Sequence, residues 1–212
     1  MNTKTTLLAC ALTMPAVAAF GQILFEDFEG TPTIPSSWTV FSVDADTGNS
    51  WFEDSFSGDN FAEVNAFNDT AAANDWLISP LVSIPTTSVN PFLTFQNTKN
   101  FDDSGVPEPL SVLWSTSYSG SGDPTGDFTE FTGVNYSSGS FNEVSSGNID
   151  LSGFVGQDIY IGFQYESSGT GAGSSALFQL DDVSVVPEPE FYGALVGLLA
   201  IGFAVIRRRR RS

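Results

Sequence analysis

Short runs of aromatic and β-branched residues alternate along the chain with stretches rich in Gly, Ser, Thr, Asn and Asp. This pattern is typical of many short strands joined by turns. No segment between the two ends has the 3.6-residue periodicity of an amphipathic helix, although residues 150–154 predict a single helical turn. The predicted strands are 23–28, 38–42, 74–79, 91–98, 110–115, 158–166 and 177–186.

The strand expected at 158–166 has the clearest alternation of apolar and polar positions. Because successive side chains in a strand point to opposite faces, one face is apolar and the other is mixed. The apolar face carries Ile159, Ile161, Phe163 and Tyr165, and the other carries Tyr160, Gly162, Gln164 and Glu166. One buried face and one wetter face suit an antiparallel β-sandwich, so the predicted fold class is all-β.

The first 21 residues predict a secretory signal peptide and export by the Sec machinery. Lys4 supplies the positive charge, and residues 7–19 form an apolar run too short to span a bilayer. Small residues follow, and we expect cleavage after Gly21. The alternative is lipidation at Cys10, since the residues before it loosely resemble a lipoprotein box.

The last residues of the chain predict a membrane-spanning tail. An apolar stretch covers 191–206, and its sixteen residues would span about 24 Å as a helix, slightly less than the ~30 Å hydrocarbon core. The arginines that follow can reach the interface and should stay in the cytoplasm, which places the acidic domain outside. The flanking residues are Val186, Pro187, Glu188 and Pro189 before the stretch, and Arg207, Arg208, Arg209, Arg210 and Arg211 after it.

This order of Pro-Glu-Pro, apolar span and terminal arginines resembles the PEP-CTERM sorting signal of Gram-negative bacteria. The resemblance implies a transient stay in the inner membrane, cleavage by an exosortase, and final location at the cell surface or in the extracellular matrix. The alternative is an ordinary membrane anchor that is never processed. The tetrapeptide alone does not identify the signal, because Val106-Pro107-Glu108-Pro109 repeats it without an apolar span behind it. The apolar span and the arginines that follow the C-terminal copy are what the interpretation depends on.

The chain is therefore predicted to have three parts: a signal peptide (1–21), a folded domain (22–186) and a sorting tail (187–212).

The net charge of the chain limits the classes of molecule that it can bind. It has 25 acidic and 7 basic residues, a formal net charge of −18, and Lys99 is the only basic residue between the two ends. Nucleic acid is therefore excluded as a partner, because almost nothing basic is present to neutralise phosphates. The chain has no histidine and its one cysteine is Cys10, which excludes a Ser-His-Asp triad and disulfides in the folded domain. A cation is a plausible partner.

Several phrases of the folded domain resemble the choice-of-anchor J, or cleaved-adhesin, domain, a relative of MAM domains. They are Phe25-Glu26-Asp27-Phe28-Glu29-Gly30, Asn74-Asp75-Trp76-Leu77-Ile78-Ser79-Pro80 and Leu180-Asp181-Asp182-Val183. The resemblance implies a jelly-roll β-sandwich, frequently with bound calcium, in secreted adhesins that carry varied anchors. This chain departs from the family pattern where a tryptophan commonly precedes the last phrase, since Phe178 stands there.

Four carboxylates are the candidate ligands of a structural calcium ion: Glu26, Glu29, Asp181 and Asp182. Asp181 and Asp182 are adjacent in a predicted strand, so one of them should face the core unless a bulge intervenes. An unpaired buried carboxylate is costly, and calcium, which takes six to eight oxygen ligands, would compensate it. The alternative is that these acids line solvated strand ends.

The expected function is that of a non-catalytic surface or matrix protein in adhesion, or associated with exopolysaccharide. One alternative is a carbohydrate-binding module with exposed aromatic residues, for which Trp51 is the candidate ligand contact, being the tryptophan expected to be partly exposed. The other is a jelly-roll glycoside hydrolase. Glu26 and Glu29 argue against it, because a spacing of three puts them on opposite faces of a regular strand.

Overall fold

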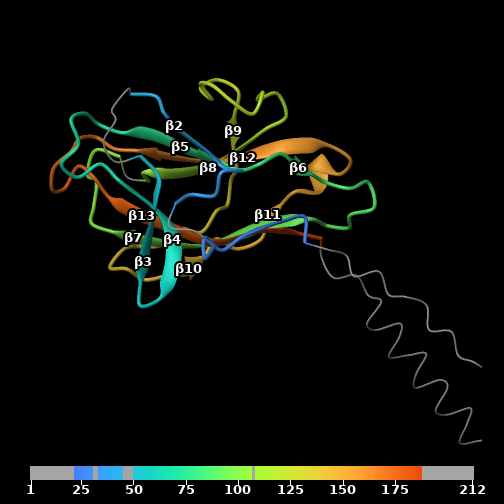
Figure 1. Ribbon diagram of the computed structural model, residues 1–212, viewed down its shortest axis with the longest axis horizontal. Helices are drawn as coiled ribbons and strands as arrows, with labels where there is room; N and C mark the ends of the chain where they lie inside the picture. The colour runs from blue at the N-terminus through green and yellow to red at the C-terminus, as the bar shows by residue number, and fades with distance from the viewer. Residues whose placement is uncertain (1–21, 31–32, 45–49, 107, 188–212) are drawn as a thin grey trace, which may run out of the picture.

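The computed structural model describes residues 22–30, 33–44, 50–106 and 108–187. These residues form two antiparallel sheets packed face to face (Figure 1), which confirms the predicted all-β sandwich. Within these ranges, no helix has both the length and the apolar composition needed to cross a membrane. The predicted signal peptide lies outside the described residues, as do Glu188, Pro189 and the five arginines of the predicted tail.

Sheet A has seven strands, with the order β10-β7-β13-β4-β3 along its main path. Two further strands join it, since β1 pairs with β13 and β11 pairs with β7. The first described strand therefore lies beside the last. The strands are β1 (Leu24–Glu26), β3 (Phe52–Phe56), β4 (Asp59–Asn65), β7 (Phe92–Asn100), β10 (Val144–Ser145), β11 (Ile149–Asp150) and β13 (Leu177–Val186).

Sheet B has six strands, ordered β2-β5-β12-β8-β9, with β6 paired to β12. Its strands are β2 (Thr39–Ser42), β5 (Asn74–Ile78), β6 (Val82–Ser83), β8 (Leu110–Ser115), β9 (Thr129–Glu130) and β12 (Asp158–Glu166). The helical turn predicted near residue 150 is a 3-10 helix, η1 (Ser152–Phe154). All seven predicted strands are present, with ends that differ by up to two residues.

The core lies between the two sheets. The four apolar positions predicted to face it from β12 are each 0 % exposed. Phe163 lies at its centre, with its ring edge-on to Phe95 at a centroid distance of 5.2 Å and 6.3 Å from Trp38. Burying one such aromatic side chain contributes roughly 1.5–3 kcal/mol. This continuous core holds the two sheets together. A binding site therefore has to lie on an outer face of the sandwich or in its loops.

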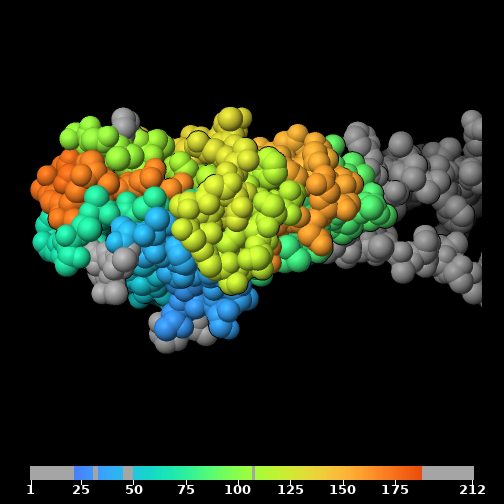
Figure 2. Space-filling model, turned by 90° about the horizontal axis from the view of Figure 1, so that it is seen from above, coloured from blue at the N-terminus to red at the C-terminus, as the bar shows by residue number. Residues whose placement is uncertain are grey.

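The outer face of sheet B is covered by its own small apolar cluster. Tyr118, three residues after the end of β8, packs against Phe128 with a ring-centroid distance of 5.2 Å, and the Phe128 ring lies 5.2 Å from that of Trp76. Figure 2 looks down on this side and shows the yellow-green segment after β8 spread across it. A Cβ on Gly162 would stand only 3.1 Å from the Phe128 ring. This face of β12 is therefore less wet than its sequence predicts.

A two-residue turn, Ser57-Gly58, joins β3 to β4, and the sequence analysis missed this hairpin. Phe56 pairs with Asp59 across the turn. Ser57 and Gly58 have φ values of 59° and 91°, and positive φ at both central residues is the geometry whose twist suits a hairpin. The hairpin places β4 between β3 and β13, at the heart of sheet A.

A bulge in β13 changes which residues face the core. The register with β7 shifts between Asp181 and Ser184, and Asp182 has φ 49°. Phe178 and Leu180, before the bulge, are buried in the core, and Val183, after the bulge, is buried there as well. Asp181 is half-buried and Asp182 is exposed. The bulge therefore keeps both carboxylates out of the core. Strict alternation along a regular strand would have pointed one of them inward.

Candidate functional site

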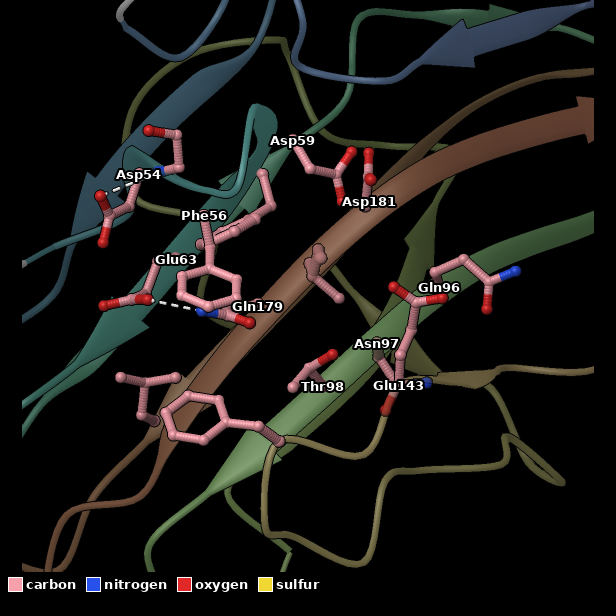
Figure 3. A pocket seen from close by; sticks show the side chains of 15 residues that line it. Asp54, Phe56, Asp59, Glu63, Gln96, Asn97, Thr98, Glu143, Gln179 and Asp181 are labelled. Atoms are coloured by element: carbon pink, nitrogen blue, oxygen red, sulfur yellow. Dashed lines mark hydrogen bonds between the residues drawn. The ribbon is translucent and has the colours of Figure 1, made fainter.

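A cleft of about 520 Å³ opens on the outer face of sheet A, across β3, β4, β13 and β7. Figure 3 shows it from close by. Its lining combines three aromatic rings with carboxylates and amides, which is the mixture found in small-ligand sites. The aromatic residues are Phe56, Phe61 and Phe141. The acidic residues are Asp54, Asp59, Glu63, Glu143 and Asp181. The amide and hydroxyl side chains include Gln96, Asn97, Thr98 and Gln179.

The floor of the cleft is a polar row that crosses three strands. Glu63 on β4 is the register partner of Gln179 on β13, which in turn pairs with Thr98 on β7. The Gln179 amide donates a hydrogen bond of 2.9 Å to Glu63 Oε2. Glu63 is only 6 % exposed, and burial raises the pKa of its carboxyl group. Hydrogen bonding thus holds the floor in one geometry.

Two phenylalanine rings stand at the rim of the cleft. Phe56, at the hairpin turn, is 77 % exposed, and Phe141 is 54 % exposed. Phe141 is supported from behind by Phe101, edge-on at 6.5 Å, while Phe61 is almost completely buried below. Large aromatic side chains left in water beside polar groups are typical of binding surfaces. These rings offer open faces to a ligand.

The acidic side chains of the cleft repel one another. Figure 3 shows the Asp59 and Asp181 carboxylates next to each other at one end. The pKa of Asp181 is raised from 3.8 to about 7, chiefly by burial and also by the nearby Asp182, Asp59 and Glu143, although a hydrogen bond from the Asp182 backbone lowers it. Lys99 does not line the cleft; its ammonium group lies 5.6 Å from the Phe178 ring centroid.

The four predicted calcium ligands do not form one site, because they lie as two pairs in separate places. The Glu26 carboxylate accepts hydrogen bonds of 3.1 Å from the Phe28 backbone and from the Trp38 indole. Glu29 accepts one of 3.0 Å from the Asn60 backbone. Asp181 and Asp182 stand at the bulge instead. In the part of the chain that the structure describes, no group of three or more His, Cys, Asp or Glu side chains is placed to hold a metal ion.

Glu53 is a further acidic residue beside the first pair, and the sequence analysis missed it. Its Oε2 atom is buried and has no hydrogen-bond partner among the described residues. Burial raises the pKa of Glu53, and the neighbouring Glu29 and Glu26 add to that rise, while a backbone hydrogen bond at Thr33 lowers it. An unpartnered buried carboxylate oxygen among other carboxylates fits the oxygen-rich chemistry that calcium prefers.

Trp51 lies in the core. It is 3 % exposed, and its indole N–H donates a hydrogen bond of 3.3 Å to the Asp75 carbonyl. The expectation that Trp51 is partly exposed is therefore wrong. The polar residues around it in sequence suggested exposure, but the residue precedes β3 at a position that points between the sheets. The indole has no open face for a ligand.

Neither a protein-family model nor a curated protein sequence matches this chain. Two solved structures that resemble it are domains of Lys-gingipain from Porphyromonas gingivalis W83. The K1 cleaved adhesin domain has a TM-score of 0.53 and 19 % identity, covering 78 % of this chain and 98 % of that domain. The K3 cleaved adhesin domain has a TM-score of 0.53 and 20 % identity, covering 78 % and 97 %. The chain shares their fold. This likeness supports the β-sandwich fold that the sequence phrases imply.

Proposed function

We propose that this chain is an exported, non-catalytic recognition protein whose cleft on sheet A binds an extracellular polysaccharide. The observation that carries the proposal is the pair of exposed rings, Phe56 and Phe141, above a hydrogen-bonded polar floor. Sugar rings present flat C–H faces to aromatic rings and hydroxyl groups to amides and carboxylates. The jelly-roll fold shared with adhesin domains supports a role in adhesion or in the exopolysaccharide matrix.

Replacing Phe56 with alanine is expected to weaken glycan binding about two- to twelvefold, because an aromatic stacking contact contributes roughly 0.5–1.5 kcal/mol. The full chain, kept in a detergent without a sugar headgroup, would be screened on a glycan array and titrated by calorimetry. Phe67→Ala is the matched control, since Phe67 is 50 % exposed and lies outside the cleft. Equal losses in both variants, or no glycan bound by the wild type, would contradict the proposal.

The arrangement of carboxylates favours binding over hydrolysis. Glycosidases place two carboxyl groups on either side of the scissile bond, about 5–9.5 Å apart. Asp59 and Asp181 instead lie side by side at one end of the cleft (Figure 3). The bound oligosaccharide should therefore be recovered intact after prolonged incubation. Shortened products in the reaction mixture would revive the hydrolase alternative.

We also propose that calcium stabilises the domain near its first strand. Glu26 and Glu29 would supply carboxylate oxygens, and the ion would compensate the charge of the neighbouring Glu53. The buried Glu53 Oε2 atom, which has no hydrogen-bond partner among the described residues, supports this proposal. Asp181 and Asp182 remain proposed ligands at the bulge, where the acidic neighbours of Asp181 would be relieved by a cation in the same way.

Export and surface sorting complete the proposed function. Sec export by the N-terminal signal and exosortase processing at the tail would deliver the domain from the inner membrane to the cell surface or matrix. Replacing Pro187, Glu188 and Pro189 with alanines should leave the protein in the inner membrane, as measured by fractionation of cells. The matched control replaces Pro107, Glu108 and Pro109 of the internal copy. Normal release of the first variant would contradict the sorting role.

A further inference from the structure

The cleft is more acidic than binding of a neutral sugar requires. Among the residues that the structure describes, five carboxylates line it and no basic side chain does. Residues 22–187 contain Lys99 as their only basic residue, and its ammonium group is 5.6 Å from the Phe178 ring centroid, outside the cleft. Carboxylates gathered in a concave surface focus a negative potential, which attracts cations and repels anions. Uronic-acid and sulfated polysaccharides are therefore poor partners.

The carboxylates of the cleft differ in how much of their hydrogen-bonding capacity is already used. Glu63 accepts from Gln179 at 2.9 Å, and Asp54 accepts from the Ser55 backbone at 2.8 Å. Asp59 and Glu143 are exposed, and among the residues that the structure describes they have no hydrogen-bond or ion-pair partner. These two carboxylates at the rim are open to a ligand.

We propose that the polysaccharide bound in this cleft carries free amino groups, that is, a polymer of amino sugars with unacetylated nitrogens. The proposal rests on the proposed function of polysaccharide binding and names its ligand class. The sugar ring would stack on Phe56, and its ammonium group would lie between Asp59 and Glu143. The exposed Phe56 ring also favours a cation close to its face.

A basic peptide would satisfy the same charges, but the cleft suits it less. Extended peptides gain most of their affinity by adding a strand to an open sheet edge. The floor strands β4 and β13 are each paired on both sides, β4 with β3 and β13, and β13 with β7 and β4. They therefore offer no main-chain partners. What the floor does offer is the side chains of Gln96, Thr98 and Gln179, which suit hydroxyl groups.

The test compares three oligosaccharides and one peptide by calorimetry on the full chain at pH 6. The probes are a glucosamine hexamer, its fully N-acetylated counterpart, a galacturonate hexamer and hexalysine. The glucosamine hexamer is expected to bind about tenfold more tightly than the acetylated one, with a preference that shrinks as salt rises. The galacturonate hexamer is expected not to bind.

Charge-neutralising variants separate a specific site from attraction to an acidic protein. Glu143→Gln and Asp59→Asn should each weaken binding of the glucosamine hexamer much more than binding of the acetylated hexamer, and so remove most of the preference. Asp158→Asn removes the same charge from an exposed position outside the cleft and should change nothing. Equal losses in the cleft variants and in Asp158→Asn would overturn the proposal.

The outcomes also separate this inference from the proposed function. Equal affinity for both hexamers would overturn the amino-sugar preference and leave polysaccharide binding standing. Tighter binding of hexalysine than of any sugar would overturn the preference in favour of a peptide ligand. Absence of binding to all three oligosaccharides would overturn the inference, and a glycan array without any bound sugar would overturn the proposed function as well.

Discussion

Asp75→Asn is expected to stabilise the folded domain at neutral pH by up to about 3 kcal/mol. Asp75 on β5 is 3 % exposed, and burial raises the pKa of its carboxyl group from 3.8 to about 6. A hydrogen bond from Ser42 lowers that pKa and the nearby Asp44 raises it. Because the folded state holds this proton more tightly than the unfolded state, folding is favoured at low pH. That stability is lost as the pH rises from about 4 to about 6.

Urea unfolding at a series of pH values measures this effect directly. The wild type should lose stability between pH 4 and 6 relative to the asparagine variant, and the difference should stay constant above pH 7. Asp181 titrates in both proteins, so subtraction removes its contribution. Asp158→Asn, at an exposed position, is the control and should follow the wild type. A variant less stable than the wild type at pH 7 would show that the Asp75 charge is compensated.

Removal of calcium is expected to lower the melting temperature of the protein by about 5–10 °C. With 1 mM free calcium and a dissociation constant of about 10 µM, linkage gives about 2.7 kcal/mol of stabilisation. For a domain of this size, each kcal/mol shifts the melting temperature by roughly 2–4 °C. The expected site lies beside Glu53, whose buried Oε2 has no hydrogen-bond partner among the described residues. Differential scanning fluorimetry with calcium and with EDTA measures the shift.

Glu53→Gln tests whether this site is the origin of the shift. The variant should show a smaller difference in melting temperature between calcium and EDTA, because removing one of three neighbouring negative charges weakens the attraction for the ion. It should also exceed the calcium-free wild type in stability, since repulsion from Glu26 and Glu29 is reduced. Asp158→Asn should keep the full shift. A wild type indifferent to EDTA would contradict calcium binding.

The sequence predicted the core strands of both sheets well, because their side chains obey simple alternation. In β12, Ile159 to Tyr165 face the core at every second position, as burial between two sheets requires. β13 was predicted with both of its ends correct. The two-residue strands β6, β9, β10 and β11 were missed, since so short a segment carries no periodicity.

The candidate site was largely missed because the hairpin that builds it was missed. β3 and β4 carry polar residues on their outer face, which made the segment resemble a loop. The available signal was Ser57-Gly58 between two alternating runs, a turn that favours positive φ at both positions. Recognising it would have placed Phe56, Asp59 and Glu63 on one face of a sheet.

The two carboxylates in the middle of β13 were predicted as candidate ligands, but the direction in which they point was not predicted. Alternation alone would have sent either Asp181 or Asp182 into the core. The bulge lets the strand skip a position, so Leu180 and Val183 both face inward. Placement of a bulge depends on pairing with β7 and β1, which are distant in sequence. The local sequence pattern therefore could not predict which side chains surround Asp181 and Asp182.

Hydrogen–deuterium exchange of the full chain, with and without the tightest-binding oligosaccharide of the array, tests most directly that the cleft on sheet A is the binding site. Slower exchange is expected at the hairpin turn, residues 54–60, and at residues 139–145, which together carry both exposed rings. Residues 117–128, which follow β8 over sheet B, should exchange at an unchanged rate. Protection confined to residues 117–128, or no protection at all, would contradict a binding cleft on sheet A.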